Sequence, residues 1–230
     1  MPITTVLLDA GGVILDESEA ERVWADAMVR MLGAVVPQYD RQRYESDVAE
    51  AVAAFSPSVR QYVLWKHARP DRRLCDELWS AHVEGMRTRR PALVLMAGVD
   101  EEIRRLSEDF GLVIAGQYGG ELLDLLNRHG LLGCFASRLT QDDFDITKPD
   151  PRYLERIVQR TGVGPEACIM VGDRIDNDIV PAKQLGMKTI RIRVGLHRNQ
   201  EPRTPDEAPD AELDGVKGLA ATVRAIAATG

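Results

Sequence analysis

The sequence predicts a doubly wound α/β domain, built on a parallel sheet, with an all-helical domain inserted after the first strand. Beyond Gly98, short continuous apolar runs alternate with segments of helical periodicity, which is typical of a parallel sheet covered by helices on both faces. Between about residues 17 and 90, Glu, Arg, Ala, Met and Trp recur at helical spacing without a convincing strand pattern. We therefore expect a core domain formed by residues 1–16 and 92–230, and a helical domain at 17–91.

The expected elements follow this division in order. The first strand covers residues 3–9, where an apolar run rich in β-branched residues reaches Asp9 and is followed by Gly11 and Gly12. The helices of the insertion are separated by Pro37, Pro57 and Pro70. The later strands are expected at 112–115, 136–139, 168–171 and 189–194. The later helices are expected at 100–109, 119–129, 150–161, 177–185 and 216–228, and a polar loop is expected at 197–210.

Composition and charge exclude several classes of partner. Hydrophobic residues make up 44% of the 230 residues and charged residues 28%, as in ordinary globular proteins. The net charge of -7 argues against nucleic acid and anionic membranes as partners, whereas a small phosphorylated molecule needs only a locally positive site.

The chain lacks a signal-peptide pattern and the roughly 18–20 apolar residues of a membrane-spanning helix. The widely spaced Cys75, Cys134 and Cys168 fit buried thiols in a reducing compartment, so we expect a cytoplasmic protein.

Acidic residues gather where the fourth expected strand ends. Asp173, Asp176 and Asp178 follow the apolar run, and carboxylates this close in sequence repel one another unless a cation lies among them. Hard oxygen ligands of this kind suit Mg²⁺. The alternative interpretation is helix capping by Asp176 or Asn177, with Asp178 interacting favourably with the helix dipole.

Two further residues stand at the same edge of the expected sheet, where ligands bind in such folds. Asp9 closes the first strand, and the glycines after it allow backbone amides to approach an anion closely. If the first and fourth strands are neighbours, Asp9 lies beside Asp173. Lys148, held out of a helix by Pro149, could neutralise a bound phosphate and keep Asp9 ionised. The alternatives are an ordinary turn aspartate and a solvated loop lysine.

The order of these motifs resembles the haloacid dehalogenase-like hydrolase superfamily with a helical cap. The motifs are D-A-G-G-V at 9–13, K-P-D-P at 148–151 and V-G-D-R-I-D-N-D at 171–178. The resemblance implies a Rossmann-like core and a cap that closes over the site and determines specificity. It also implies that Asp9 is a nucleophile that forms an aspartyl-phosphate, stabilised by Lys148. Mg²⁺ would be held by Asp9, Asp173, Asp178 and the carbonyl of Gly11.

The sequence departs from that family pattern at two positions. Gly11 stands where phosphatases of the family carry a second Asp as general acid and base, and Ala115 stands where they carry Ser or Thr. Loss of a general acid or base typically costs about 10²–10⁴ in rate. Backbone amides of Gly12, Gly116 and Gln117, or the side-chain amide of Gln117, could still bind the phosphate.

Three functions remain compatible with the sequence. The first, which we favour, is Mg²⁺-dependent hydrolysis of a small phosphorylated metabolite whose leaving group needs little protonation or supplies its own acid. The second is cleavage of a carbon–halogen or carbon–phosphorus bond through Asp9. The retained Asp173 and Asp178 weigh against a dehalogenase, and Lys66 is the only lysine of the insertion that could form the imine of a phosphonate-cleaving enzyme. The third is a non-catalytic relative that binds a phosphorylated ligand or a protein.

Most other polar residues of the insertion receive no role from the sequence. Its arginines cannot be ranked, and they include Arg41, Arg43, Arg60 and Arg69. The tryptophans at helical spacing are interpreted as core residues, namely Trp24, Trp65 and Trp79.

Overall fold

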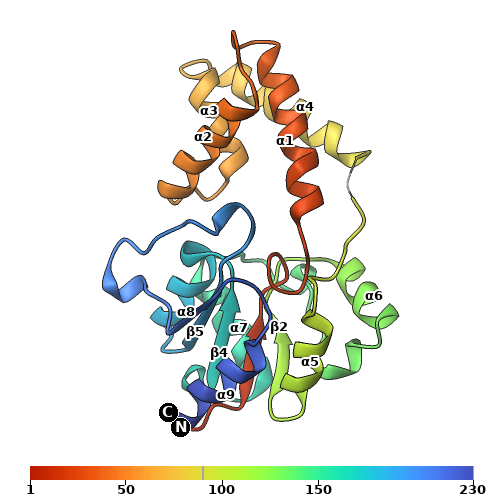
Figure 1. Cartoon of the computed structure of the whole chain (residues 1–230), viewed down its shortest axis with the longest axis vertical. Coiled ribbons are helices and arrows are strands. Elements are labelled where there is room, and N and C mark those ends of the chain that lie inside the picture. The colour runs from red at the N-terminus through yellow and green to blue at the C-terminus, as the bar shows by residue number, and fades with distance from the viewer. Residues whose placement is uncertain (90, 230) are drawn as a thin grey trace. The chain divides into compact units, whose positions relative to one another are not determined.

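The computed structural model describes residues 1–89 and 91–229, so Arg90, inside the expected insertion, and Gly230 lie outside the described residues. The chain divides into two compact units (Figure 1). Met1–Asp16 and Leu93–Gly230 form the core unit, which holds the sheet. Glu17–Ala92 form the helical unit, whose described part contains helices and no strand.

The core unit is built on one parallel sheet, as the sequence predicted, and this sheet has six strands where the sequence indicated five. Its strand order is β3-β2-β1-β4-β5-β6. The strands are β1 (Thr5–Leu8), β2 (Gly111–Ile114), β3 (Phe135–Ser137), β4 (Cys168–Gly172), β5 (Lys188–Ile192) and β6 (Ala211–Leu213). Leu8 is in register with Ile114 of β2 and with Val171 of β4. The carboxyl ends of these three central strands are therefore level, and the residues that follow them emerge at one edge.

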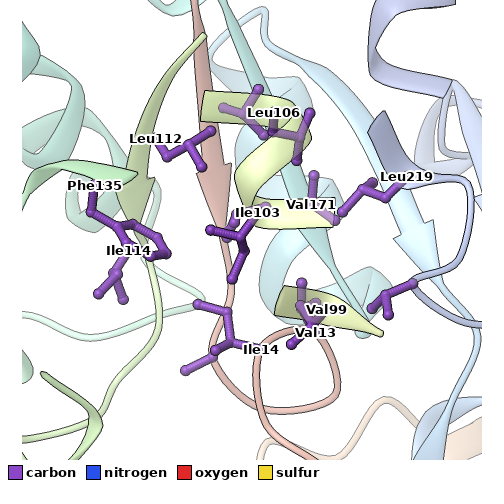
Figure 2. Close-up of a cluster of buried hydrophobic side chains, with 14 of the residues drawn as sticks. Val13, Ile14, Val99, Ile103, Leu106, Leu112, Ile114, Phe135, Val171 and Leu219 are labelled. Carbon is purple, nitrogen blue, oxygen red and sulfur yellow. The ribbon is translucent and has the colours of Figure 1, made fainter. Parts of the chain in front are cut away.

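Helices cover both faces of the sheet because side chains alternate between the faces along each strand. Leu8 packs in a cluster with α5 (Val99–Ser107), α6 (Gly120–Arg128) and α9 (Leu219–Thr229). Leu7 packs in a second cluster with α7 (Pro151–Thr161) and α8 (Val180–Gln184). Figure 2 shows side chains of β2, β4, α5 and α9 converging in the first cluster. Complete burial of each such apolar side chain stabilises the unit by roughly 1.5–3 kcal/mol.

The helical unit contains α1 (Ser18–Gly33), α2 (Arg41–Ala53), α3 (Val59–Ala68) and α4 (Arg72–Arg87). Three of these helices begin at a side chain that accepts a hydrogen bond from a backbone N–H of the first turn, namely Asp40, Ser58 and Asp71. The prediction that the tryptophans are core residues is wrong for Trp65, which is 43% exposed. With Trp79 it lines a surface pocket of about 290 Å³.

The structure differs from the expected elements in two places. The strand β6, which follows the loop expected at 197–210, was not predicted. Its three residues are too few to show the periodicity of a strand. The helix expected at 177–185 begins with a π-helical turn, η4 (Ile175–Ile179), before α8 starts. Within the described residues, none of the helices combines the length and the hydropathy needed to cross a membrane.

Candidate active site

Three carboxylates and one ammonium group meet at the carboxyl edge of the sheet. Asp9 follows β1, Asp173 follows β4, and Asp178 lies in η4. One carboxylate oxygen from each of the three lies within 4.8 Å of the others. Lys148 Nζ donates to Asp9 Oδ1 and to Asp178 Oδ1, each at 2.6 Å. The structure thus brings together the four side chains on which the predicted chemistry depends.

Two glycines allow the acids to approach so closely. Gly12 has a φ of 69°, and a Cβ built on it would lie 2.9 Å from Cβ of Asp173. A Cβ on Gly172 would lie 2.3 Å from Cβ of Asp178. Both positions therefore exclude larger residues. Gly12, three residues after Asp9, and Gly172, directly before Asp173, are therefore required for close packing of the acidic cluster.

The K-P-D-P motif positions Lys148 by starting a helix immediately after it. Asp150 accepts a hydrogen bond from the backbone N–H of Arg152 at 3.0 Å, and Pro151 occupies the first turn of α7. The helix then packs on the sheet through buried side chains such as Tyr153. As a result the side chain of Lys148 is only 2% exposed, which excludes the solvated-lysine alternative.

Burial and charge act against each other at this cluster. Burial of Lys148 favours its neutral form, but the adjacent carboxylates of Asp178 and Asp9 outweigh burial and raise its pKa above the ordinary value. Burial raises the pKa of Asp178 to about 6, with a contribution from the Asp9 carboxylate and an opposing one from Lys148. Lys148 therefore remains an ammonium ion, and Asp178 acquires a protonation equilibrium near neutral pH.

The donor set fits a hard divalent cation. Three carboxylates and one ammonium group carry a formal charge of -3 + 1 = -2, which one Mg²⁺ would balance, and the three oxygens are close enough to share one ion. Gly11 lies in the turn after Asp9, where it pairs with Leu15. The ligand role of its carbonyl stays a prediction.

The end of β2 lies in closely packed surroundings. Ala115 is completely buried in the cluster of the α7 face. Gly116 lies against Ala10, two residues beyond β1, since a Cβ at Gly116 would be 2.3 Å from Cβ and 2.5 Å from the backbone N of Ala10. Its carbonyl accepts a hydrogen bond from the Tyr153 hydroxyl at 3.2 Å. Gln117 is the first partly exposed residue beyond the strand. The phosphate-binding roles of Gly12, Gly116 and Gln117 stay predictions.

Sequence reasoning missed the side chains that hold the acidic turn. Asp176 does not cap η4; its carboxylate pairs with Arg174 at 2.6 Å and accepts a hydrogen bond from Gln200 at 3.1 Å. Asp178 Oδ2 accepts the backbone N–H of Arg174 at 3.1 Å. Arg191 of β5 is fully buried beside this turn. The only sequence signal for Arg191 was its position as a charged residue within the apolar strand expected at 189–194.

Lys66 in the helical unit is held by two acidic side chains. Lys66 donates to Asp47 at 2.7 Å and to Glu50, and these hydrogen bonds raise its pKa. A lysine held as an ammonium ion is a poor imine-forming nucleophile. These contacts weigh against Lys66 as the imine-forming lysine of the carbon–phosphorus alternative.

The arginines of the helical unit also differ from one another. Arg41 pairs with Asp26, whereas Arg60 stacks on the ring of Trp24, 4.2 Å from its centroid. Trp24 is thus partly a stacking partner and not only a core residue.

Comparison with known proteins finds one matching family and relatives that are named as phosphatases. A family model described as haloacid dehalogenase-like hydrolase matches residues 3–186. A glyceraldehyde 3-phosphate phosphatase from Methanopyrus kandleri is 34% identical over 126 residues, which cover 55% of this chain and 54% of that protein. The match thus spans about half the length of that relative. A phospholysine phosphohistidine inorganic pyrophosphate phosphatase from Danio rerio is 25% identical over 185 residues, covering 74% of this chain and 67% of that protein.

Solved structures show the same fold over nearly the whole chain. A conserved haloacid dehalogenase-like protein of unknown function from Agrobacterium tumefaciens has a TM-score of 0.70 at 21% identity, covering 98% of this chain and 99% of that one. A haloacid dehalogenase-like family hydrolase from Xanthomonas campestris has a TM-score of 0.67 at 16% identity, covering 99% and 97%. At these identities the likeness concerns the fold, and the function must be argued from the site.

Proposed function

The chain belongs to the haloacid dehalogenase-like hydrolase family, and from this premise we propose that it is a Mg²⁺-dependent phosphatase of a small phosphorylated metabolite. The observation that carries the proposal is the convergence of Asp9, Asp173 and Asp178 on one edge of the sheet, with Lys148 between two of them. The names of the two curated relatives, both phosphatases, support it.

The metal would be held by the three carboxylates, with the Gly11 carbonyl as a further ligand. Carboxylate oxygens are the ligands that Mg²⁺ prefers in proteins. When bound there, the ion would neutralise negative charge on the phosphoryl oxygens. The chain itself contributes the fixed positions of the acids, which follow from the level ends of β1 and β4.

Asp9 is the proposed nucleophile. A carboxylate oxygen attacks phosphorus while the bond from phosphorus to the leaving group breaks, which gives an aspartyl-phosphate. Water then attacks the same phosphorus, which releases inorganic phosphate and restores the carboxylate. Lys148 orients Asp9 through their 2.6 Å hydrogen bond and supplies a positive charge beside the transferred group.

The phosphoryl group would be bound mainly by backbone amides. The turn after Asp9 contains Gly12 with its left-handed φ, and the end of β2 contributes Gly116 and Gln117. Amides in such turns form concave donors for anions. The side-chain amide of Gln117 adds one further donor, which offsets the absence of a hydroxyl at Ala115.

The preferred substrates would be those whose leaving group departs without a proton from the enzyme. Gly11 has no side chain and so contributes no acid beside Asp9. Alkoxide leaving groups need protonation, whereas phosphate and carboxylate leaving groups are stable as anions. Phosphoramidate nitrogens are basic, so they can carry a proton before the phosphorus–nitrogen bond breaks and leave as the neutral amine. The relative from Danio rerio is named for phospholysine, phosphohistidine and inorganic pyrophosphate, which all belong to this class.

A substrate panel tests the proposal. Purified protein is assayed for phosphate release from glyceraldehyde 3-phosphate, pyrophosphate, acetyl phosphate, phospholysine and a phosphonate, with Mg²⁺ or with EDTA. We expect turnover on the anhydrides and the phosphoramidate, loss of turnover in EDTA, and recovery when Mg²⁺ is restored. Asp9→Asn should abolish turnover.

Asp109→Asn is the matched control, because this aspartate pairs with Arg224 on the surface of the core unit. The control variant should retain wild-type rates. Unchanged turnover in Asp9→Asn would refute the nucleophile assignment. Absence of turnover on every substrate, in protein shown to be folded, would instead favour the ligand-binding alternative.

A further inference from the structure

A buried arginine reaches the acidic turn from the neighbouring strand. Arg191, on β5, has no exposed surface. Its Nε donates to the backbone carbonyl of Asp173 at 3.3 Å, and its Nη2 donates to the carbonyl of His197 at 2.8 Å. Its Nη1 forms an ion pair with Glu212 at 3.0 Å. One guanidinium thus connects β6, the segment 195–198 and the residue that follows β4.

A buried glutamine holds the same turn at its other end. Gln200 is 1% exposed. Its Oε1 accepts the backbone N–H of Ile175 at 2.8 Å, and its Nε2 donates to Asp176 at 3.1 Å. Together, Arg191 and Gln200 attach both ends of the segment 173–176 to β5 and to the chain that follows it.

These buried polar groups are difficult to explain by stability alone. Burying a guanidinium carries a large desolvation cost, and well-packed apolar residues of similar volume are often as stabilising as a buried ion pair. The planar fork of arginine, however, fixes the relative positions of several acceptors at once. The acceptors here are backbone oxygens of Asp173 and His197, so the guanidinium fixes the path of the chain at the acidic turn.

We propose that Arg191 and Gln200 are positioning residues for the acidic cluster, and that their loss weakens metal binding at Asp9, Asp173 and Asp178. The inference rests on the proposed function, because it assigns a purpose to the same site. Arg191 acts through the backbone of Asp173, and Gln200 acts through Ile175 and Asp176. Neighbours that orient metal ligands in this way typically contribute about 10–100-fold to metal affinity.

Arg193 provides a matched control on the same stretch of chain. It shares two partners with Arg191, since its Nε donates to the carbonyl of Arg198 at 3.2 Å and its Nη1 lies 3.5 Å from Glu212. Arg191 also contacts both of these partners. Of the two arginines, only Arg191 has a hydrogen bond to the carbonyl of Asp173 among those of the described residues.

The test measures metal affinity directly. Mn²⁺ is titrated into wild type, Arg191→Met, Gln200→Met and Arg193→Met, with free Mn²⁺ followed by EPR, and Mg²⁺ affinity is obtained by competition. We expect a loss of about 10–100-fold in Arg191→Met and Gln200→Met. Arg193→Met should bind Mn²⁺ as wild type does. At saturating Mg²⁺ the kcat of Arg191→Met and Gln200→Met should approach that of wild type. The Mg²⁺ concentration that gives half of the maximal rate should stay higher than in wild type.

The outcomes separate the inference from the function on which it rests. If wild type binds no Mn²⁺, the proposed metal site itself is wrong. If wild type binds and Arg191→Met binds equally well, the positioning role is wrong. Thermal unfolding in EDTA checks that each variant is folded. Should Arg191→Met fail to fold, Gln200→Met decides alone: weakened binding supports the inference, and wild-type binding overturns it.

Discussion

Replacing Lys148 by Met would remove the ammonium group that donates hydrogen bonds to two of the three clustered acids, Asp9 and Asp178. Lys148 and Asp178 are both almost completely buried, with side chains 2% and 0% exposed, and Asp9 is 10% exposed. The substitution keeps most of the side-chain volume. Its principal effect is therefore electrostatic: the formal charge of the cluster changes from -2 to -3.

The expected destabilisation follows from this burial. Removing one partner of a buried, hydrogen-bonded ion pair typically costs about 3–5 kcal/mol, because the remaining charge loses its compensation. For a protein of this size, 1 kcal/mol corresponds to roughly 2–4 °C in Tm. We therefore expect the metal-free variant to unfold roughly 6–20 °C below wild type at neutral pH. Mg²⁺ should reduce that difference, since a divalent ion supplies the missing positive charge.

The assay is thermal unfolding of both proteins in EDTA and in saturating Mg²⁺. Lys183→Met is the matched control, because the ammonium group of Lys183 donates to the carbonyl of Ala208 at 2.7 Å. Loss of that neutral acceptor contact should cost about 1 kcal/mol. If Lys148→Met in EDTA unfolds at the temperature of the control variant, Lys148 does not compensate the acids, and the electrostatic account of the site is wrong.

Two further predictions concern the missing acid and the protonation of Asp178. Gly11→Asp should accelerate hydrolysis of alkyl phosphates by about 10²–10⁴-fold and leave the rates on anhydrides unchanged, because only the alkoxide needs a proton; equal acceleration on both in steady-state kinetics would contradict this. The raised pKa of Asp178, about 6, means that the folded state binds a proton more readily than the unfolded state. Metal-free stability should therefore fall as pH rises through about 6, whereas Mg²⁺ affinity should fall as pH drops below it; Mn²⁺ titrations at pH 7 and pH 5 that give equal affinities would refute the assignment.

The sequence was sufficient for five of the six strands and for the acidic cluster because both depend on local patterns. Apolar runs marked β1 and β4, and a parallel sheet brings the ends of neighbouring strands to one edge. Asp9, Asp173 and Lys148 stand next to such runs or to a helix start, so their side chains could be expected to meet.

The remaining features depend on contacts that no local pattern records. Arg191 acts on the carbonyl of Asp173, and a backbone acceptor leaves no trace in the identity of its residue. Gln200 lay in a segment expected to be a polar loop, yet it is buried. The ion pairs of Lys66 with Asp47 and Glu50, which weigh against it as a nucleophile, cannot be predicted from the sequence. The exposure of Trp65 depends on which helix faces pack together, and hydrophobicity alone does not determine that.

The position of β1 has a consequence for how the protein acquires its chemistry. Leu8 is bordered by Ile114 and Val171, so the proposed nucleophile next to it is synthesised early but gains its neighbours only after most of the chain exists. Pairings between residues so distant in sequence slow folding, because loop closure must precede them. A chain released before β4 would retain Asp9 and lack both of its acidic partners. Such a fragment would lack the ligands needed to bind the ion, whatever helices it formed.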